Sequence, residues 1–168
     1  DGRVVRGNAV AVNANLKLFY TSLVPAGALD SEFLRRMQEF RCGSGTFRMN
    51  VALSALPDFS ALPGPGDHLT AGIIMAPSIA YMDRAWQDAV AHGWSREPIV
   101  EMLIPSTLDD SLAPQGQHVA SLFCQQFAPE LPDGRDWDAE EDKAADTIID
   151  TVEAHAPGFR ASILGRQI

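Results

Sequence analysis

The sequence predicts an α+β fold, with a largely antiparallel sheet of about four or five strands and amphipathic helices on one face. Stretches with apolar residues at helical spacing alternate with period-two stretches, in the order helix, helix, strand, strand, helix, strand, strand, helix. The strand candidates come in pairs joined by loops, as in antiparallel hairpins. At 168 residues, 46% of them hydrophobic, the chain has the size and composition of one globular domain.

The first stretch has the pattern of a strand without a partner. Asp1 and Gly2 form a typical hairpin turn pair, and a strand-like run follows over residues 4–12. No residue precedes the turn to pair with this strand. We therefore expect the chain to begin as an excised piece of a longer protein does.

Two helices are expected next. The first spans residues 15–24, where Asn15 is a suitable N-cap and Pro25 stops the helix. The second spans residues 30–40, and Asp30 can accept hydrogen bonds from the free N–H groups of its first turn.

Residues 46–56 carry the clearest strand pattern in the chain. Alternate positions are apolar and predict one buried face: Phe47, Met49, Val51 and Leu53. The other face carries Arg48, Asn50 and Ser54, which is less charged than a water-exposed sheet face usually is. Arg48 and Asn50 are therefore candidate substrate-binding residues. Cover by a neighbouring domain explains the same pattern equally well.

A loop rich in proline and glycine leads to a second strand, expected over residues 69–75. Ser78 then opens a helix that Gly93 closes. Helical spacing predicts that this helix buries one apolar side, formed by Ile79, Met82, Trp86, Ala89 and Val90.

Two further strands are expected over residues 99–104 and 118–127. The last helix is predicted to begin at Asp138, which forms a capping-box pair with Glu141. Its buried side is expected to contain Ala145, Ile148, Ile149 and Val152. Residues 159–168 are an apolar tail to which no element is assigned.

Composition excludes several functional classes. The net charge of -9 would repel a phosphate backbone, so no nucleic-acid partner is expected. Cys42 and Cys124 lie far apart in the sequence, which signals neither a disulfide framework nor a zinc site. The sequence lacks an apolar run of the roughly 18 residues that a membrane span needs. We expect a soluble protein of the reducing cytoplasm.

The chain carries no complete catalytic motif, and no catalytic residue is assigned. The glycines that flank Ser44 are not followed by lysine, so they indicate a turn before a strand rather than a phosphate loop. The four histidines are scattered, and no metal site is expected. A hydrolase would need Cys42 or Cys124 beside His118, but buried structural cysteines are the favoured interpretation.

The order of several short motifs resembles the phytoene-desaturase-like FAD-dependent oxidoreductases, which are amine-oxidase-type flavoproteins. The motifs are Ala-Val-Asn-Ala-Asn at 11–15, Gly-Thr-Phe-Arg-Met-Asn-Val-Ala-Leu at 45–53, Gly-Gln-His at 116–118 and Phe-Arg-Ala-Ser at 159–162. Each motif is weak alone, and their order over nearly the whole chain carries the resemblance.

The resemblance implies that residues 15–168 are a substrate or interface domain and that residues 1–14 are a strand remnant crossing from an absent FAD-binding domain. It places Asn13 and Ala14 near the flavin of the intact protein. The glycine-rich FAD fingerprint would lie outside this chain, so this piece is expected to bind no FAD by itself and to be inactive alone. The intact protein would pass hydride from a small apolar or amine-like substrate to flavin.

A second hypothesis comes from a different functional class. A non-enzymatic interaction or dimerisation module would use the free sheet face or the unpaired first strand to form a homodimer.

Overall fold

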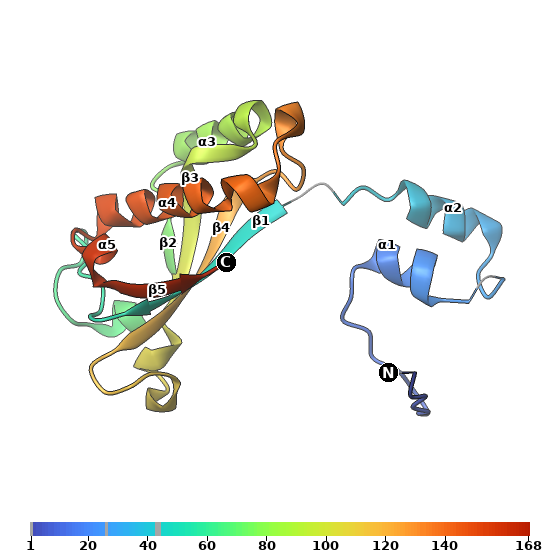
Figure 1. Ribbon diagram of the computed structural model, residues 1–168, viewed down its shortest axis with the longest axis horizontal. Coiled ribbons are helices and arrows are strands. Elements are labelled where there is room, and N and C mark those ends of the chain that lie inside the picture. The colour runs from blue at the N-terminus through green and yellow to red at the C-terminus, as the bar shows by residue number, and fades with distance from the viewer. Residues whose placement is uncertain (1, 26, 43–44) are drawn as a thin grey trace. The chain divides into compact units, whose positions relative to one another are not determined.

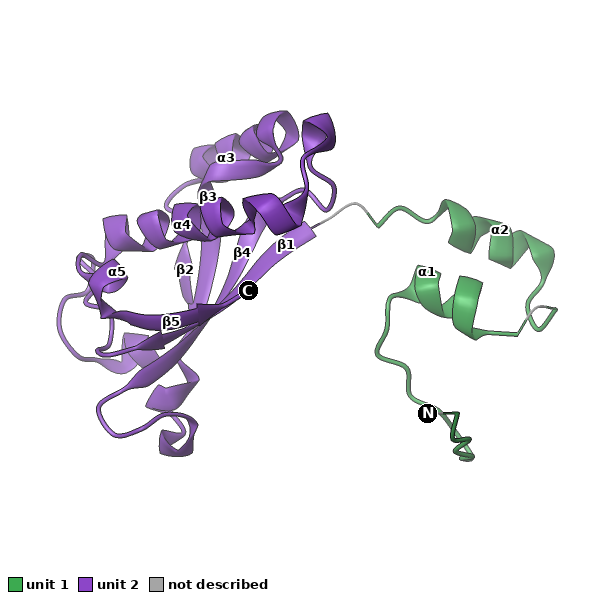
Figure 2. Ribbon diagram, in the orientation of Figure 1, with its two compact units in different colours: residues 1–42 green, residues 43–168 purple. Residues whose placement is uncertain are grey.

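The computed structural model describes residues 2–25, 27–42 and 45–168, and Figure 1 shows the elements in chain order. The chain divides into two compact units, Asp1–Cys42 and Gly43–Ile168 (Figure 2). This division comes later in the chain than the boundary expected after Ala14. The turn expected at Asp1 and the turn expected around Ser44 involve residues outside the described ones.

The described residues of the first unit contain three short helical elements: α1 (Leu16–Leu18), a π-helical turn (Phe19–Leu23) and α2 (Ser31–Glu39). Both predicted N-caps are confirmed. The Asn15 side chain accepts from the Leu18 amide at 3.1 Å, and the Asp30 side chain accepts from the Phe33 amide at 2.9 Å. The Tyr20 ring meets the Phe33 ring edge-on, with centroids 5.0 Å apart.

The strand expected over residues 4–12 is not present. Described residues 2–14 contain neither helix nor strand, and Val5 is 93% exposed. A strand persists only where its backbone N–H and C=O groups pair with a neighbour. No described residue forms a ladder with this segment, so its β-branched residues alone do not make it a strand.

The second unit is built on a five-stranded sheet in which every pair is antiparallel, with strand order β2-β3-β4-β1-β5. The strands are β1 (Gly45–Leu53), β2 (Ile73–Met75), β3 (Trp94–Leu103), β4 (His118–Phe127) and β5 (Ile163–Gln167). The α-helices are α3 (Ile79–His92), α4 (Trp137–His155) and α5 (Phe159–Ser162). The predicted α+β class is confirmed.

The main core lies between the sheet and α4. The predicted alternation of β1 is confirmed, because its odd-numbered residues from Phe47 to Leu53 are all buried. The apolar side of α4 packs in the same cluster, and its predicted members are all buried: Ala145, Ile148, Ile149 and Val152. Burial of large apolar side chains of this kind contributes about 1.5–3 kcal/mol each to folding.

Helix α3 has the predicted ends but not the predicted buried face. The Ser78 side chain accepts from the Tyr81 amide, and Gly93 closes the helix in the left-handed conformation. The predicted buried side is nevertheless exposed at four of its five positions: Ile79 86%, Met82 45%, Trp86 57% and Val90 65%.

The packing of α3 against β3 explains this difference. The Arg96 amide donates to the Asp88 carboxylate at 3.2 Å, and the Tyr81 hydroxyl donates to the Pro98 carbonyl at 2.9 Å. The helix therefore covers part of the outer edge of the strand, which needs a close approach through small residues such as Ala85 and Ala89. Burial, followed by the charge of Glu97, raises the pKa of Tyr81 to about 12.

The N-cap of α4 also differs from the expected one. The helix begins at Trp137, and Asp136 is its cap, accepting from the Asp138 amide at 3.2 Å. The Trp137 indole N–H donates to the Ala128 carbonyl, and its ring packs near that of Phe47. This packing draws Trp137 into the first turn, so the capping box predicted at Asp138 and Glu141 is wrong.

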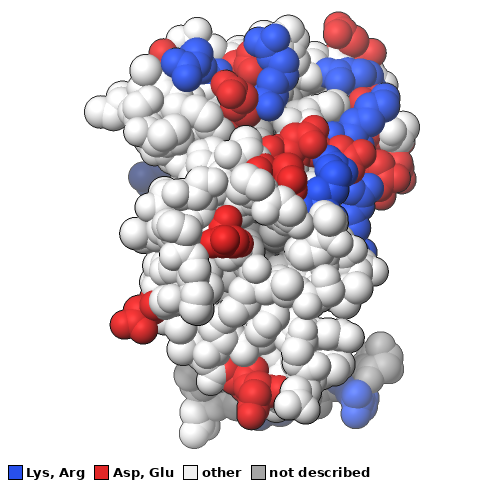
Figure 3. Space-filling model, turned by 90° about the vertical axis from the view of Figure 1, so that its left-hand side faces the viewer, with Lys and Arg blue, Asp and Glu red and all other residues white. Residues whose placement is uncertain are grey.

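The apolar tail after α4 contains two elements that the sequence did not predict, α5 and β5. Strand β5 pairs with β1, and salt bridges join this segment to α4. Arg166 contacts Asp142 at 2.6 Å and Asp146 at 3.0 Å, while Arg160 contacts Asp150 at 2.7 Å. Basic and acidic side chains also gather side by side along the top and one edge of the surface in Figure 3.

Replacing Asp146 with asparagine is expected to loosen β5. Hydrogen bonds from Arg166, and then from Arg160, hold the pKa of Asp146 below its ordinary value of 3.8. A lowered folded-state pKa contributes stability that is present above the unfolded value and is lost as pH falls through the folded value. Amide hydrogen exchange of residues 163–167, corrected for intrinsic rates, should therefore be faster in the variant at neutral pH, and the two proteins should converge in acid.

The matched control is Glu141→Gln, on the same helix but without a described ion pair to the tail. Equal loss of protection in the two variants at neutral pH would contradict a specific role for Asp146.

Candidate functional site

The face of the sheet opposite the α4 core is the candidate site. Directly paired residues lie on the same side of a sheet. The register therefore places Leu103, Ser121, Asn50 and Gln167 in one row across β3, β4, β1 and β5. A second row contains Ile74, Glu101, Phe123 and Arg48. All eight side chains are half-buried or exposed.

Arg48 and Asn50, the two predicted substrate-binding residues, share this face. The Arg48 guanidinium donates to the Ser121 hydroxyl at 2.9 Å across the β1–β4 pair. Asn50 is directly opposite Ser121 and lines a groove of about 500 Å³ together with Gln167 and Ala52. A pocket of this volume is within the range of small-molecule sites. The structure places the two residues together; their binding role stays a prediction.

The rest of the face mixes polar and apolar side chains. The Gln125 side chain donates to the Glu101 carboxylate at 3.2 Å. Phe123 pairs with Glu101 on one side and with Arg48 on the other. Leu103 is 54% exposed. An apolar surface with a few fixed polar groups suits a mostly apolar ligand that has a polar part.

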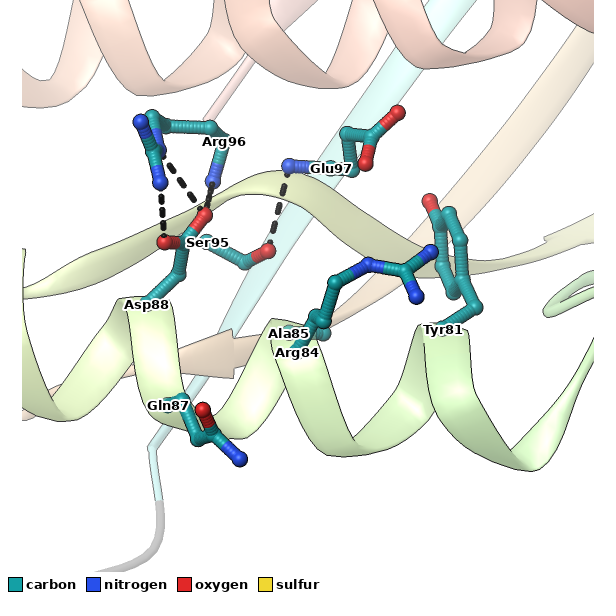
Figure 4. A pocket seen from close by; sticks show the side chains of 8 residues that line it. All are labelled: Tyr81, Arg84, Ala85, Gln87, Asp88, Ser95, Arg96 and Glu97. Atoms are coloured by element: carbon teal, nitrogen blue, oxygen red, sulfur yellow. Dashed lines mark hydrogen bonds and ion pairs between the residues drawn. The ribbon is translucent and has the colours of Figure 1, made fainter.

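A second pocket, of about 520 Å³, lies between α3 and β3 (Figure 4). Its polar groups are largely bonded to one another. The Arg96 guanidinium contacts the Asp88 carboxylate at 2.6 Å, and the Glu97 amide donates to the Ser95 hydroxyl. The hydrogen bond from Arg96 lowers the pKa of Asp88 against the opposing effect of burial. These polar contacts join α3 to the edge of β3, so the groups that line this pocket serve to hold the helix on the strand.

The structure argues against Cys124 as the nucleophile of a hydrolase. Burial, followed by the charge of Glu101, raises the pKa of the Cys124 thiol, which disfavours the nucleophilic thiolate. His118 is six positions earlier on the same strand, and strand geometry separates such residues by about 20 Å. The buried position expected for both cysteines is confirmed for Cys124 and wrong for Cys42, which is exposed in the first unit with the Asn15 side-chain nitrogen 3.6 Å from its sulfur.

Two further sequence predictions concern cofactors and metals. Asn13 and Ala14 lie just before α1 in the first unit and are exposed. Their expected place near a flavin stays a prediction. Within residues 2–25, 27–42 and 45–168, no three His, Cys, Asp or Glu side chains are grouped to hold a metal ion.

The comparisons with known proteins extend over the whole chain. No protein-family model matches it. Pyridine nucleotide-disulfide oxidoreductase domain-containing protein 2 of Mus musculus is 35% identical over 175 residues, an alignment that covers 100% of this chain and 30% of the mouse protein. The chain is similar to this mammalian oxidoreductase-domain protein. The Rattus norvegicus protein of the same name is 36% identical over 174 residues, covering 99% of the chain and 30% of the rat protein.

The chain thus spans about 30% of the length of the curated relatives it matches. Their name supports the oxidoreductase part of the predicted resemblance and does not mention phytoene. The described helices include none that is both long and apolar enough to cross a membrane.

Sequence reasoning missed the neighbours of Arg48 and Asn50 on the open face. Ser121, Gln125 and Glu101 are on strands that were expected, and alternation within β4 would have placed Ser121 and Gln125 on one side. Strand order and register were the missing information, because no local pattern shows which strands are neighbours.

Proposed function

We propose that this chain is the substrate-binding part of a flavin-dependent oxidoreductase. The open face of β1 and β4 would form one wall of the substrate cavity. The observation that carries the proposal is the groove beside Asn50 and the Arg48–Ser121 hydrogen bond, in a chain similar along its length to oxidoreductase-domain proteins.

The residues of this chain do not fit an FAD-binding fold. Dinucleotide-binding folds use parallel strands with a G-x-G-x-x-G turn at a helix N-terminus. Every strand pair described here is antiparallel, and the sequence has no such motif. The flavin would therefore be held by the remaining polypeptide.

The contribution proposed for this chain is to orient the substrate and exclude water. Phe123, Leu103 and Val119 would contact an apolar substrate, while Arg48 and Asn50 would contact its polar part. Removal of hydride from an apolar or amine-like substrate is the reaction proposed for the intact protein, and a phytoene-like polyene is one candidate substrate.

Replacing Arg48 with alanine in the longer flavin-loaded protein is expected to raise KM about tenfold, because loss of one charged hydrogen bond costs about 1.4 kcal/mol. Flavin content, measured by absorbance, should not change. Steady-state kinetics with candidate amines and polyenes gives KM. The 168-residue chain alone should retain no flavin after gel filtration.

Arg84→Ala is the matched control, since Arg84 is an exposed arginine on α3 with no described hydrogen bond or salt bridge. An unchanged KM in the Arg48→Ala variant would show that Arg48 does not contact the substrate. A longer protein that carries no flavin would overturn the oxidoreductase proposal.

A second candidate is a module that binds a second copy of this chain. The exposed apolar stripe on α3, formed by Ile79, Met82, Trp86 and Val90, favours it. Exposed apolar patches often mark interaction surfaces. This candidate replaces the first if the longer protein carries no flavin and the 168-residue chain dimerises through Trp86.

A further inference from the structure

The open face of β1 carries three successive rows of paired residues that change from charged to apolar along the strand. Each row is named after its β1 residue, and the rows are Arg48 with Phe123, Asn50 with Ser121 and Gln167, and Ala52 with Val119 and Gly165. Alternate residues of a strand point to the same face, so the three rows share one side of the sheet. Two residues separate successive rows, which places the Arg48 row about 13 Å from the Ala52 row.

The Ala52 row forms an apolar and hollow end of the groove. Ala52 and Val119 are half-buried and line it together with Pro105. Gly165 has no side chain, and a Cβ atom at this position would have no heavy atom within 4 Å. The missing side chain therefore keeps this end of the groove open, where an apolar chain of a ligand can lie.

The Asn50 row contributes only neutral polar groups, namely two amides and one hydroxyl. Arg166 also lines the groove, but its guanidinium is already bound to carboxylates of α4. The distances are 2.6 Å to Asp142 and 3.0 Å to Asp146. Arg166 therefore offers no free charge to a ligand in the groove.

The guanidinium of Arg48 has no carboxylate partner among the described residues. Its hydrogen bond, 2.9 Å long, goes to the neutral hydroxyl of Ser121, and the side chain is exposed. The acid of the same row is Glu101, which lies beyond Phe123 at a distance of two strand spacings, about 10 Å. The open N–H groups of a guanidinium fit the two oxygens of a carboxylate.

We propose that the substrate of this site is a carboxylic acid with an apolar chain. Arg48 would bind the carboxylate, and the chain would lie along the groove toward Gly165. This inference rests on the proposed function in treating the ligand as a substrate, and it names the polar part of that substrate. A protonated amine at the same position would be repelled by Arg48, and an uncharged polyene would leave the guanidinium without an anion.

The test is a titration of the 168-residue chain with octanoate, followed by the backbone amide resonances of residues 50, 121 and 167 and the Nε–H resonance of Arg48. Saturable binding that shifts these resonances is expected. 1-Octanol should bind about tenfold more weakly, because it lacks the charged hydrogen bond, and octylammonium should bind more weakly still. Absence of saturable binding, or equal affinity for octanoate and octanol, would overturn the proposal.

Arg48→Gln tests the carboxylate contact. This variant should bind octanoate about tenfold more weakly and should bind octanol as the unmodified chain does. Arg84→Gln is the matched control on α3, and it should leave both affinities unchanged. If Arg48→Gln weakens octanoate and octanol equally, Arg48 maintains the groove without recognising the carboxylate, and the inference fails.

Gly165→Phe tests the position of the apolar chain. The position has open space and no left-handed φ, so the ring can enter the groove, where it should abolish octanoate binding. Leu164→Phe is the control, because it adds a ring at an exposed position of the same strand outside the groove. Backbone amide spectra report whether each variant keeps its fold. If Gly165→Phe keeps both its fold and its octanoate affinity, the ligand is bound elsewhere and the proposal is wrong.

The carboxylate inference and the proposed function fail in different experiments. A chain that binds no octanoate, together with a longer protein that carries flavin, overturns the carboxylate inference alone. A longer protein without flavin overturns the oxidoreductase role, and octanoate bound to its groove would then not be a substrate.

Discussion

Replacing Ile148 with alanine is expected to lower the free energy of unfolding of this chain by about 2–5 kcal/mol. Ile148 is fully buried on α4, in the cluster that joins the helix to the sheet. Its truncation removes buried methyl and methylene groups and leaves a cavity that close-packed neighbours fill only in part. Urea denaturation followed by far-UV circular dichroism measures the change.

Ile79→Ala is the matched control, because it is the same substitution on an exposed position of another helix. Ile79 is 86% exposed, so the expected change is within about 0.5 kcal/mol. Equal destabilisation in both variants would mean that the apolar stripe of α3 is buried, as the sequence pattern alone suggested.

Gly93→Ala is the second substitution with a large expected effect, a destabilisation of about 2–4 kcal/mol from backbone strain and overpacking together. The backbone φ of Gly93 is +97°, which favours glycine. A Cβ atom there would also lie 2.6 Å from Leu131 Cδ2 and 2.9 Å from Pro132 Cδ. Both causes act at the C-terminal end of α3, and thermal and urea unfolding measure their sum.

Gly158→Ala separates the two causes. Its φ is +93°, but no heavy atom lies within 4 Å of a Cβ at this position. The Gly158→Ala variant should therefore lose only the roughly 1–2 kcal/mol of folding stability that a left-handed backbone conformation costs a residue with a Cβ atom. If the two variants are equally destabilised, the contact with Leu131 and Pro132 has no energetic consequence.

Local sequence patterns correctly predicted the features that depend only on residues close in sequence. The alternation of β1 and the caps at Asn15, Asp30 and Ser78 depend on residues close in sequence, and all are confirmed. The orientation of α3 was not predictable in this way. Apolar residues lie on two sides of this helix, and the side with Ala85 and Ala89 packs because a strand edge requires a close approach.

Strand β5 was missed for a different reason. It is short, it contains Gly165, and it has no strong period-two alternation. Its stability comes from pairing with β1 and from the ion pairs of Arg166, which are contacts distant in sequence.

The candidate site was predictable only in part. Alternation within β1 identified Arg48 and Asn50 as neighbours on the face away from the core. Their polar surroundings depend on the register that brings Ser121 next to Asn50, and no pattern within either strand reports that register. Similarity to oxidoreductase-domain proteins then supplied the functional context that the residues alone lack.

The position of β1 between β4 and β5 has a consequence for how the protein folds during synthesis. This strand is made before both of its neighbours, and Val51 pairs with Ala120 on one side and with Arg166 on the other. The edge of β1 that faces β4 therefore stays open until residues 118–127 are made, and the edge that faces β5 stays open until residues 163–167 are made. Such distant pairing slows folding and leaves an open edge of an apolar strand exposed to aggregation while the rest of the unit is made.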